Sequence, residues 1–128
     1  MLTGYKILVA EDNSLNQKIA TFLLQKDGAQ VTMVANGREA VIQLAQDAFD
    51  VVLMDLQMPE MDGFETTRHI RNIMKSNVPI IALSASNYDG EMEKCREVGM
   101  NACITKPIDI QKLNNLILEL KKDNRIIA

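Results

Sequence analysis

The stretch Asp50-Val51-Val52-Leu53-Met54-Asp55-Leu56-Gln57-Met58-Pro59 is the most informative part of this sequence, because a short apolar run ends abruptly on a carboxylate. Such a run, rich in Val and Leu and closed by a proline turn, is typical of a strand buried on both faces, as in parallel sheets. Asp55 then lies at the carboxyl end of the strand, where open α/β sheets bind their ligands. Asp55 is therefore either a functional residue or a cap of the turn before Pro59.

The composition is that of one globular domain. The chain has 128 residues, of which 47% are hydrophobic and 24% charged, enough for a single core. A formal net charge of -3 without a basic block argues against direct binding of nucleic acid. No apolar run approaches the roughly 20 residues of a membrane helix, so we expect no membrane contact by this segment. We predict a domain over residues 1–121 and a polar tail over 122–128.

The two cysteines, Cys95 and Cys103, form neither a Cys-x-x-Cys pair nor a dense framework, and no secretory signal precedes them. We therefore expect reduced thiols and a cytoplasmic location.

Short apolar runs alternate with helical patterns along the whole chain. Besides the run that ends at Asp55, we predict strands at Lys6–Ala10, Val31–Val34, Val78–Leu83 and Ala102–Thr105. After the first strand, apolar residues recur at helical spacing, with Asn13 or Ser14 as N-cap and Gly28 as the stop; this stripe comprises Leu15, Ile19, Phe22 and Leu23. Further helical patterns cover residues 40–48, 64–74, 89–98 and 113–120. Five strands alternating with five helices define a doubly wound parallel sheet of the α/β class.

Polar side chains follow four of these strands, at the point where each strand ends. Because all parallel strands end at the same edge of the sheet, these side chains converge there; they are Glu11, Asp12, Asp55, Ser84 and Lys106. Convergence from four separate strands is hard to explain by turn capping. The sequence therefore favours a functional site.

Three carboxylates at one edge repel one another unless a cation lies between them. Their oxygens suit Mg²⁺, or Mn²⁺, better than Ca²⁺, because the acids lack the spacing of a calcium-binding EF-hand loop. No cysteine and histidine cluster suggests zinc. We therefore predict a magnesium site held mainly by Glu11 and Asp12, with Asp55 beside it.

If Glu11 and Asp12 hold most of the metal, Asp55 keeps an oxygen free to attack phosphorus and form an aspartyl phosphate. Lys106 can pair with one phosphoryl oxygen, and the Ser84 hydroxyl can donate to another. The sequence contains neither a Walker A loop nor a Gly-x-Gly-x-x-Gly fingerprint, so a bound nucleotide is not the expected phosphoryl donor.

The motifs together resemble the receiver domains of two-component response regulators, from about Lys6 to Leu120. The resemblance rests on these segments: Glu11-Asp12-Asn13, Val52 to Pro59, Met61-Asp62-Gly63, Ala82-Leu83-Ser84-Ala85 and Lys106-Pro107. It implies a flavodoxin-like fold with strand order 2-1-3-4-5 in chain numbering, in which the first and third strands are neighbours. Asp12 would then lie beside Asp55.

The resemblance also implies a role for each residue. Asp55 would be the phosphoacceptor, Glu11, Asp12 and the Gln57 main-chain carbonyl would join Asp55 around the metal, Ser84 would be the switch hydroxyl, and Lys106 would pair with the phosphate. Gln57 and Ser86 hold positions that tune phosphate lifetime. The phosphoryl group would come from a phosphohistidine on a histidine kinase or a histidine phosphotransfer protein. The domain would catalyse both this transfer and the later hydrolysis, as a monomer or weak dimer.

One position departs from the family pattern. Receivers often carry an aromatic switch residue three positions before the lysine, and here that residue is Cys103. We therefore expect a phosphorelay intermediate more than an activator that switches through an aromatic side chain. Asn13, Asn16 and Gln17 resemble receivers fused to hybrid sensor kinases. The sequence leaves open whether this segment is a single-domain regulator or part of such a kinase.

Two other classes compete with the receiver. Phosphohydrolases of the haloacid dehalogenase type carry a second aspartate two residues after the nucleophile, where this chain has Gln57. Degenerate receivers that only bind proteins lose the acids or the lysine, and this chain keeps all of them. Turnover of a generic phosphoester would indicate the first class, and absence of any covalent phosphate the second.

Overall fold

The computed structural model describes residues 2–85 and 89–127. Its parallel sheet has the order β2-β1-β3-β4-β5, which confirms the predicted doubly wound class and strand order. The strands are β1 (Lys6–Ala10), β2 (Gln30–Val34), β3 (Val51–Asp55), β4 (Ile80–Ser84) and β5 (Ala102–Thr105). The helices are α1 (Ser14–Lys26), α2 (Gly37–Gln46), α3 (Gly63–Asn72), α4 (Asp89–Val98) and α5 (Ile110–Ile127).

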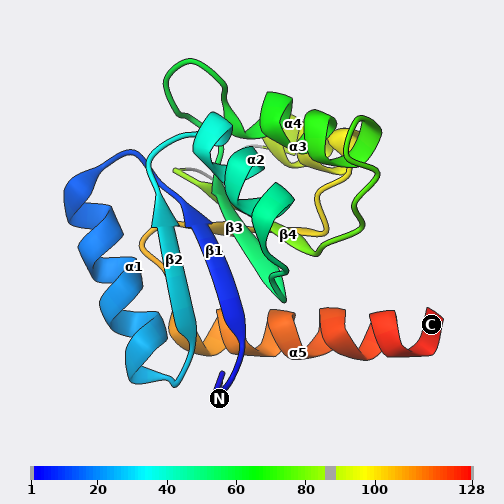
Figure 1. The fold of residues 1–128 in the computed structure, drawn as a ribbon. Coiled ribbons are helices and arrows are strands. Elements are labelled where there is room, and N and C mark those ends of the chain that lie inside the picture. The colour runs from blue at the N-terminus through cyan, green and yellow to red at the C-terminus, as the bar shows by residue number, and fades with distance from the viewer. Residues whose placement is uncertain (1, 86–88, 128) are drawn as a thin grey trace.

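The sheet separates two hydrophobic cores, because successive side chains of a strand point to opposite faces. On β1, Leu8 and Ala10 pack under α2, α3 and α4, whereas Ile7 and Val9 pack under α1 and α5. Figure 1 shows the two sets of helices on opposite sides of the sheet. Every residue of β3 and β4 is buried, as expected for central strands of a parallel sheet.

The strand register brings the predicted polar residues to one edge. Ala10 is paired with Met54, and the residues that come next are Glu11, directly after β1, and Asp55, the last residue of β3. Asp55 is paired with Leu83, and Ser84 with Thr105, the residue before Lys106. The carboxyl ends of four strands therefore meet as predicted.

Helix ends differ slightly from the sequence prediction. The Asn13 side chain accepts a hydrogen bond from the Asn16 N–H, so Asn13 is the N-cap of α1 rather than Ser14. α3 ends at Asn72, which leaves Ile73 70% exposed although it belonged to the predicted apolar pattern. α5 runs to Ile127, beyond Leu120. The domain limits inferred from the sequence remain a prediction.

The apolar stripe of α1 does not face the core. Leu15 and Phe22 are each 63% exposed and Ile19 is 41% exposed, whereas Ala20 and Leu24 are buried against the sheet. The periodicity predicted the helix correctly, but the residues of α1 that are buried are Ala20 and Leu24 rather than this stripe. This leaves an exposed apolar face beside the carboxyl edge of the sheet, formed by Leu15, Ile19 and Phe22 and called here the α1 face.

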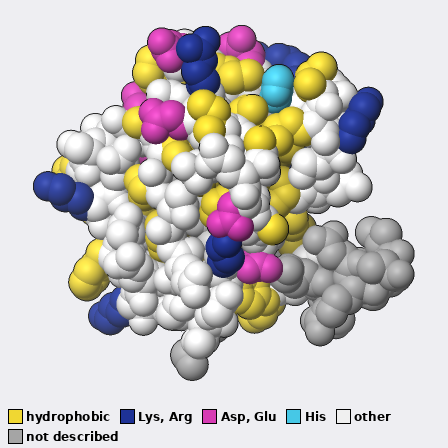
Figure 2. All heavy atoms as spheres, viewed as in Figure 1, with side chains coloured by type: hydrophobic (Ala, Val, Ile, Leu, Met, Phe, Trp, Pro, Cys, Tyr) yellow, Lys and Arg dark blue, Asp and Glu magenta, His cyan; other side chains and the backbone are white. Residues whose placement is uncertain are grey.

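Basic side chains are spread singly over the side of the molecule seen in Figure 2, rather than gathered in one patch. Among the described residues, no helix combines the length and the apolar character needed to cross a membrane.

Candidate functional site

An open cleft of about 660 Å³ lies at the carboxyl edge of the sheet. Its walls come from the ends of β1, β3 and β4, the start of α1, the first turn of α4, and the residue after β5. The lining includes Glu11, Asp12, Asn13, Asn16, Asp55, Gln57, Glu91 and Lys106. Sequence-distant segments thus build one site, as the parallel topology requires.

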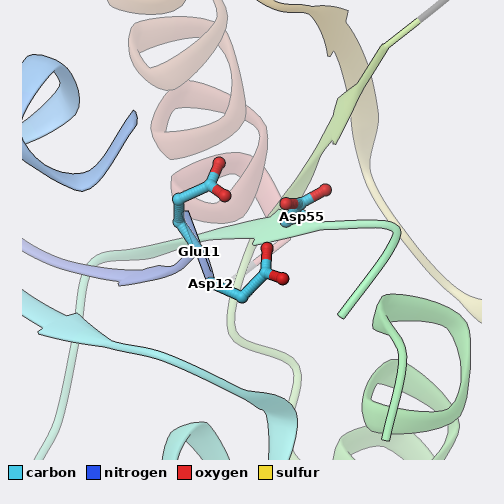
Figure 3. A group of neighbouring side chains, drawn as sticks. All are labelled: Glu11, Asp12 and Asp55. Atoms are coloured by element: carbon cyan, nitrogen blue, oxygen red, sulfur yellow. The ribbon is translucent and has the colours of Figure 1, made fainter. Parts of the chain in front are cut away.

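Three carboxylates converge in this cleft from the ends of β1 and β3 (Figure 3). One oxygen each of Glu11, Asp12 and Asp55 lies within 4.8 Å of the other two. Glu11 and Asp55 are 2% and 4% exposed, whereas Asp12 faces solvent. Three carboxylates at this spacing repel one another unless a positive charge lies beside them.

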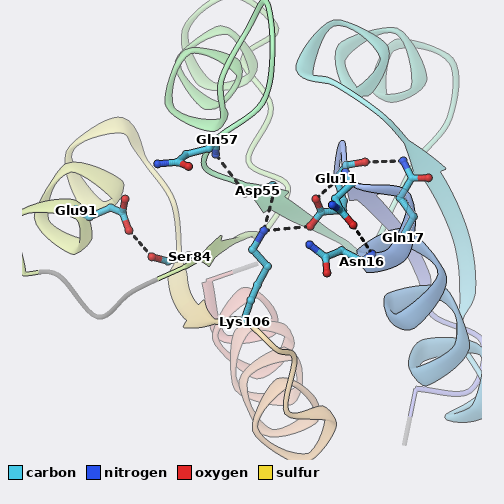
Figure 4. Close-up of polar contacts among 9 residues, drawn as sticks. Glu11, Asn16, Gln17, Asp55, Gln57, Ser84, Glu91 and Lys106 are labelled. Atoms are coloured by element: carbon cyan, nitrogen blue, oxygen red, sulfur yellow. Dashed lines mark hydrogen bonds and ion pairs between the residues drawn. The ribbon is translucent and has the colours of Figure 1, made fainter.

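Lys106 supplies part of that charge. Its Nζ lies 3.1 Å from Asp55 Oδ2 and 3.3 Å from Glu11 Oε1 (Figure 4). The lysine follows β5 directly, and its side chain spans the mouth of the sheet to reach both acids. A cis peptide bond joins it to Pro107.

The environment of Lys106 acts on its pKa in two directions. Burial lowers the pKa, but the hydrogen bond and charge of Asp55, together with the charge and hydrogen bond of Glu11, outweigh burial. The result is a pKa raised above 10.5. Lys106 is therefore fully protonated at neutral pH and provides a fixed cation beside Asp55.

Backbone amides orient the two buried acids. The Gln57 N–H donates to Asp55 Oδ1 at 3.2 Å, and the Asn13 N–H donates to Glu11 Oε2 at 3.1 Å. The Gln17 side-chain amide donates to the Glu11 carbonyl at 2.6 Å, which ties α1 to the end of β1. Each buried carboxylate is thus held in one orientation, because one of its oxygens accepts a hydrogen bond from a backbone amide and the other accepts one from Lys106.

Ser84 is the last residue of β4 and is buried. Its hydroxyl donates a hydrogen bond to Oε1 of Glu91, in the first turn of α4 (Figure 4). Sequence reasoning missed Glu91, because its role depends on how α4 packs over the end of β4. Ser86, singled out from the sequence, lies outside the described residues.

The donor set suits a hard divalent cation. All three side chains offer oxygen ligands, Asp12 is open to solvent, and Gln57 lines the same cleft. Magnesium prefers oxygen ligands and keeps several waters, which an open cleft allows. The chain therefore offers a fitting site for Mg²⁺.

The chain matches the model of the response regulator receiver domain over residues 7–118. It therefore belongs to the family of response regulator receiver domains. It acts as the receiver of a two-component phosphorelay, as the sequence analysis predicted.

Many relatives are receivers within large kinases. The chain is 36% identical to histidine kinase 1 of Arabidopsis thaliana, over 94% of this chain and 13% of the kinase. It is 41% identical to hybrid signal transduction histidine kinase B of Dictyostelium discoideum, over 91% of this chain and 6% of the kinase. The chain spans between 6% and 14% of the length of the curated relatives compared.

Solved structures show the same domain. The receiver domain of a sensor histidine kinase from Pseudomonas aeruginosa, with a magnesium ion coordinated in its active-site cleft, is 37% identical with a TM-score of 0.82, covering 91% of this chain and 97% of that one. The receiver domain of Ssk1 from Saccharomyces cerevisiae, crystallised with the phosphotransfer protein Ypd1, matches with 32% identity and a TM-score of 0.85, covering 93% of this chain and 90% of that one.

Proposed function

We propose that Asp55 accepts a phosphoryl group from a phosphohistidine, in a site that binds Mg²⁺ through Glu11, Asp12, Asp55 and the Gln57 main-chain carbonyl. The observation that carries the proposal is the position of Asp55. Its carboxylate is nearly buried, opens into the cleft, and is held between an amide and Lys106. Mn²⁺ would fit the same oxygen ligands.

The chemistry follows from the groups around Asp55. An Asp55 oxygen bonds to phosphorus as the bond from phosphorus to the histidine nitrogen breaks, and the imidazole leaves with that electron pair. In this structure Lys106 Nζ donates a hydrogen bond to Asp55 Oδ2, so it is close enough to bind a phosphoryl oxygen attached to Asp55. Bound Mg²⁺ would neutralise phosphoryl charge and orient the reacting group. Ser84 supplies a hydroxyl donor once its hydrogen turns towards the phosphate.

A protein donor has to place its histidine at the cleft, and the α1 face is the surface best suited to receive it. Asn13 and Asn16 line the cleft, and the α1 face continues from them along the same helix at spacings of four and three residues. Exposed apolar side chains next to a reactive site are typical of a protein interface. We propose that a histidine kinase or a histidine phosphotransfer protein docks there, and that the phosphate is then passed on or hydrolysed.

The proposal is tested by intact mass after incubation with acetyl phosphate, with and without Mg²⁺. We expect one phosphoryl group, dependent on Mg²⁺, and none in Asp55→Asn. Glu65→Gln is the matched control, because it removes one carboxylate from an exposed position in the first turn of α3. A phosphoryl group retained by Asp55→Asn would contradict the assignment, and no gain in the wild type would favour a protein-binding module.

A further inference from the structure

The cleft contains an acid that the proposed phosphoryl chemistry does not use. Glu91 lies in the first turn of α4, is half-buried, and lines the same cleft as Asp55 and Lys106. Its carboxylate accepts the hydrogen bond of the Ser84 hydroxyl, a side chain that is 1% exposed. Glu91 therefore connects the end of β4 to the start of α4.

The Ser84 hydroxyl cannot serve two acceptors at once. A serine has a single O–H hydrogen, so a hydroxyl that donates to Glu91 cannot also donate to a phosphoryl oxygen on Asp55. A hydrogen bond to a carboxylate is also stronger than one between neutral groups. Phosphorylation must therefore break the contact between Ser84 and Glu91 before Ser84 can bind the phosphate.

Charge acts in the same direction. A phosphoryl group brings a charge of about -1.5 to -2 into a cleft that Glu91 also lines. The Glu91 carboxylate would then face a larger negative charge without its hydroxyl partner. Both effects push the first turn of α4 away from the cleft.

We propose that Glu91 is a latch on the switch hydroxyl: it holds Ser84 and the start of α4 in the unphosphorylated arrangement, and phosphorylation of Asp55 releases both. The inference rests on the proposed function, because it takes Asp55 as the phosphoacceptor. It makes Glu91 a positioning residue, which acts on the phosphoryl group through Ser84.

The surroundings of the latch fit the unusual residue at position 103. Burial raises the pKa of both Cys95 of α4 and Cys103 of β5, and the charge of Glu91 adds to this rise. Cys95 is buried and anchors the next turn of the helix. The small Cys103 cannot swing as an aromatic side chain does, so the Glu91 carboxylate provides this chain with a different connection from Ser84 to α4.

The latch can be tested by titrating the protein with beryllofluoride in the presence of Mg²⁺, since this complex mimics a phosphoryl group on aspartate. Glu91→Ala removes the carboxylate that accepts the hydrogen bond of Ser84, and we expect this variant to bind beryllofluoride about tenfold more tightly than the wild type. Glu93→Ala is the matched control, because it removes the same charge from an exposed position on α4. It should bind like the wild type.

A double-mutant cycle separates the latch from a general charge effect. In a Ser84→Ala background, Glu91→Ala should give little further gain, because no hydroxyl is left to release. A gain that persists undiminished in that background would overturn the latch. So would equal binding by Glu91→Ala and the wild type.

Amide NMR spectra provide a readout that does not depend on affinity. Without beryllofluoride, signals from the first turn of α4 in Glu91→Ala should already be displaced towards their positions in the beryllofluoride-bound wild type. Unchanged α4 signals would contradict the latch. A wild-type chain that binds no beryllofluoride and gains no phosphoryl group would instead overturn the proposed function, and the latch with it.

Discussion

Replacing Lys106 by methionine should destabilise the protein, because it keeps most of the aliphatic side chain and removes the cation from two buried acids. Lys106 Nζ lies 3.1 Å from Asp55 and 3.3 Å from Glu11, and the lysine side chain is 23% exposed. At an effective dielectric constant of about 20, each contact is worth about 5 kcal/mol before desolvation is subtracted.

The net effect is smaller than this sum. Removing one partner of a buried ion pair costs about 3 to 5 kcal/mol, and the partial exposure of Lys106 places this site at the lower end. We therefore expect Lys106→Met to lower the free energy of unfolding by about 3 kcal/mol at pH 7.5 without Mg²⁺. With a urea m-value of about 2 kcal/mol/M, the unfolding midpoint should fall by about 1.5 M.

The assay is urea unfolding followed by circular dichroism, in chelator and again in saturating Mg²⁺. Mg²⁺ should stabilise Lys106→Met more than the wild type, because among the described residues only Lys106 forms an ion pair with Glu11 or Asp55. Lys112→Met is the control, because it removes an exposed lysine of α5, and it should change stability by less than about 0.5 kcal/mol. If Lys106→Met in chelator is as stable as the wild type, Lys106 does not compensate Glu11 and Asp55.

The pH dependence of this effect has a definite sign. Because the pKa of Lys106 is raised above 10.5 in the folded protein, its stabilisation is fully present below pH 10.5. It is lost as the pH rises through the folded pKa, when the lysine loses its proton. The stability difference between the wild type and Lys106→Met should therefore be constant from about pH 7 to 9 and shrink above pH 10.5.

Three other perturbations test separate parts of the structure. A Cβ on Gly63 would lie 2.4 Å from the Asp55 carbonyl oxygen, so Gly63→Ala should cost about 2 to 3 kcal/mol in urea unfolding; a change below about 0.5 kcal/mol would contradict this contact. Phe22→Ser should leave labelling by acetyl phosphate unchanged but slow phosphoryl transfer from a phosphohistidine protein about tenfold or more. Ile73→Ser, at another exposed apolar position, should not slow this transfer, and equal transfer rates for the two variants would exclude the α1 face as the docking site. Burial raises the pKa of Cys95 to about 12, so iodoacetamide at pH 8 should modify the half-buried Cys103 first and Cys95 only on unfolding. Peptide mapping that finds Cys95 modified first would contradict its burial.

The sheet edge could be predicted from the sequence because the central strands are buried on both faces. A short apolar run that ends on Asp55 or Ser84 marks both the strand and its carboxyl end, and parallel topology then brings these ends together. The proximity of Glu11, Asp12 and Asp55 followed from this argument.

Other features depended on tertiary packing and left no clear pattern in the sequence. The Leu15 and Phe22 stripe predicted α1 but not its core face, because Ala20 and Leu24 fit more closely against the sheet. Glu91 looks like an ordinary charged residue of a polar helix, and only the packing of α4 brings it to Ser84.

The most direct test of the account is to locate the phosphate chemically. After phosphorylation with acetyl phosphate and Mg²⁺, borohydride reduces an aspartyl phosphate to homoserine, which peptide mass spectrometry can assign to one position. The account predicts homoserine in place of Asp55 in the segment from β3 to Pro59, and none when Mg²⁺ is omitted. Homoserine at Asp12 or at any other acid, with Asp55 unmodified, would contradict the assignment of Asp55 as the phosphoacceptor.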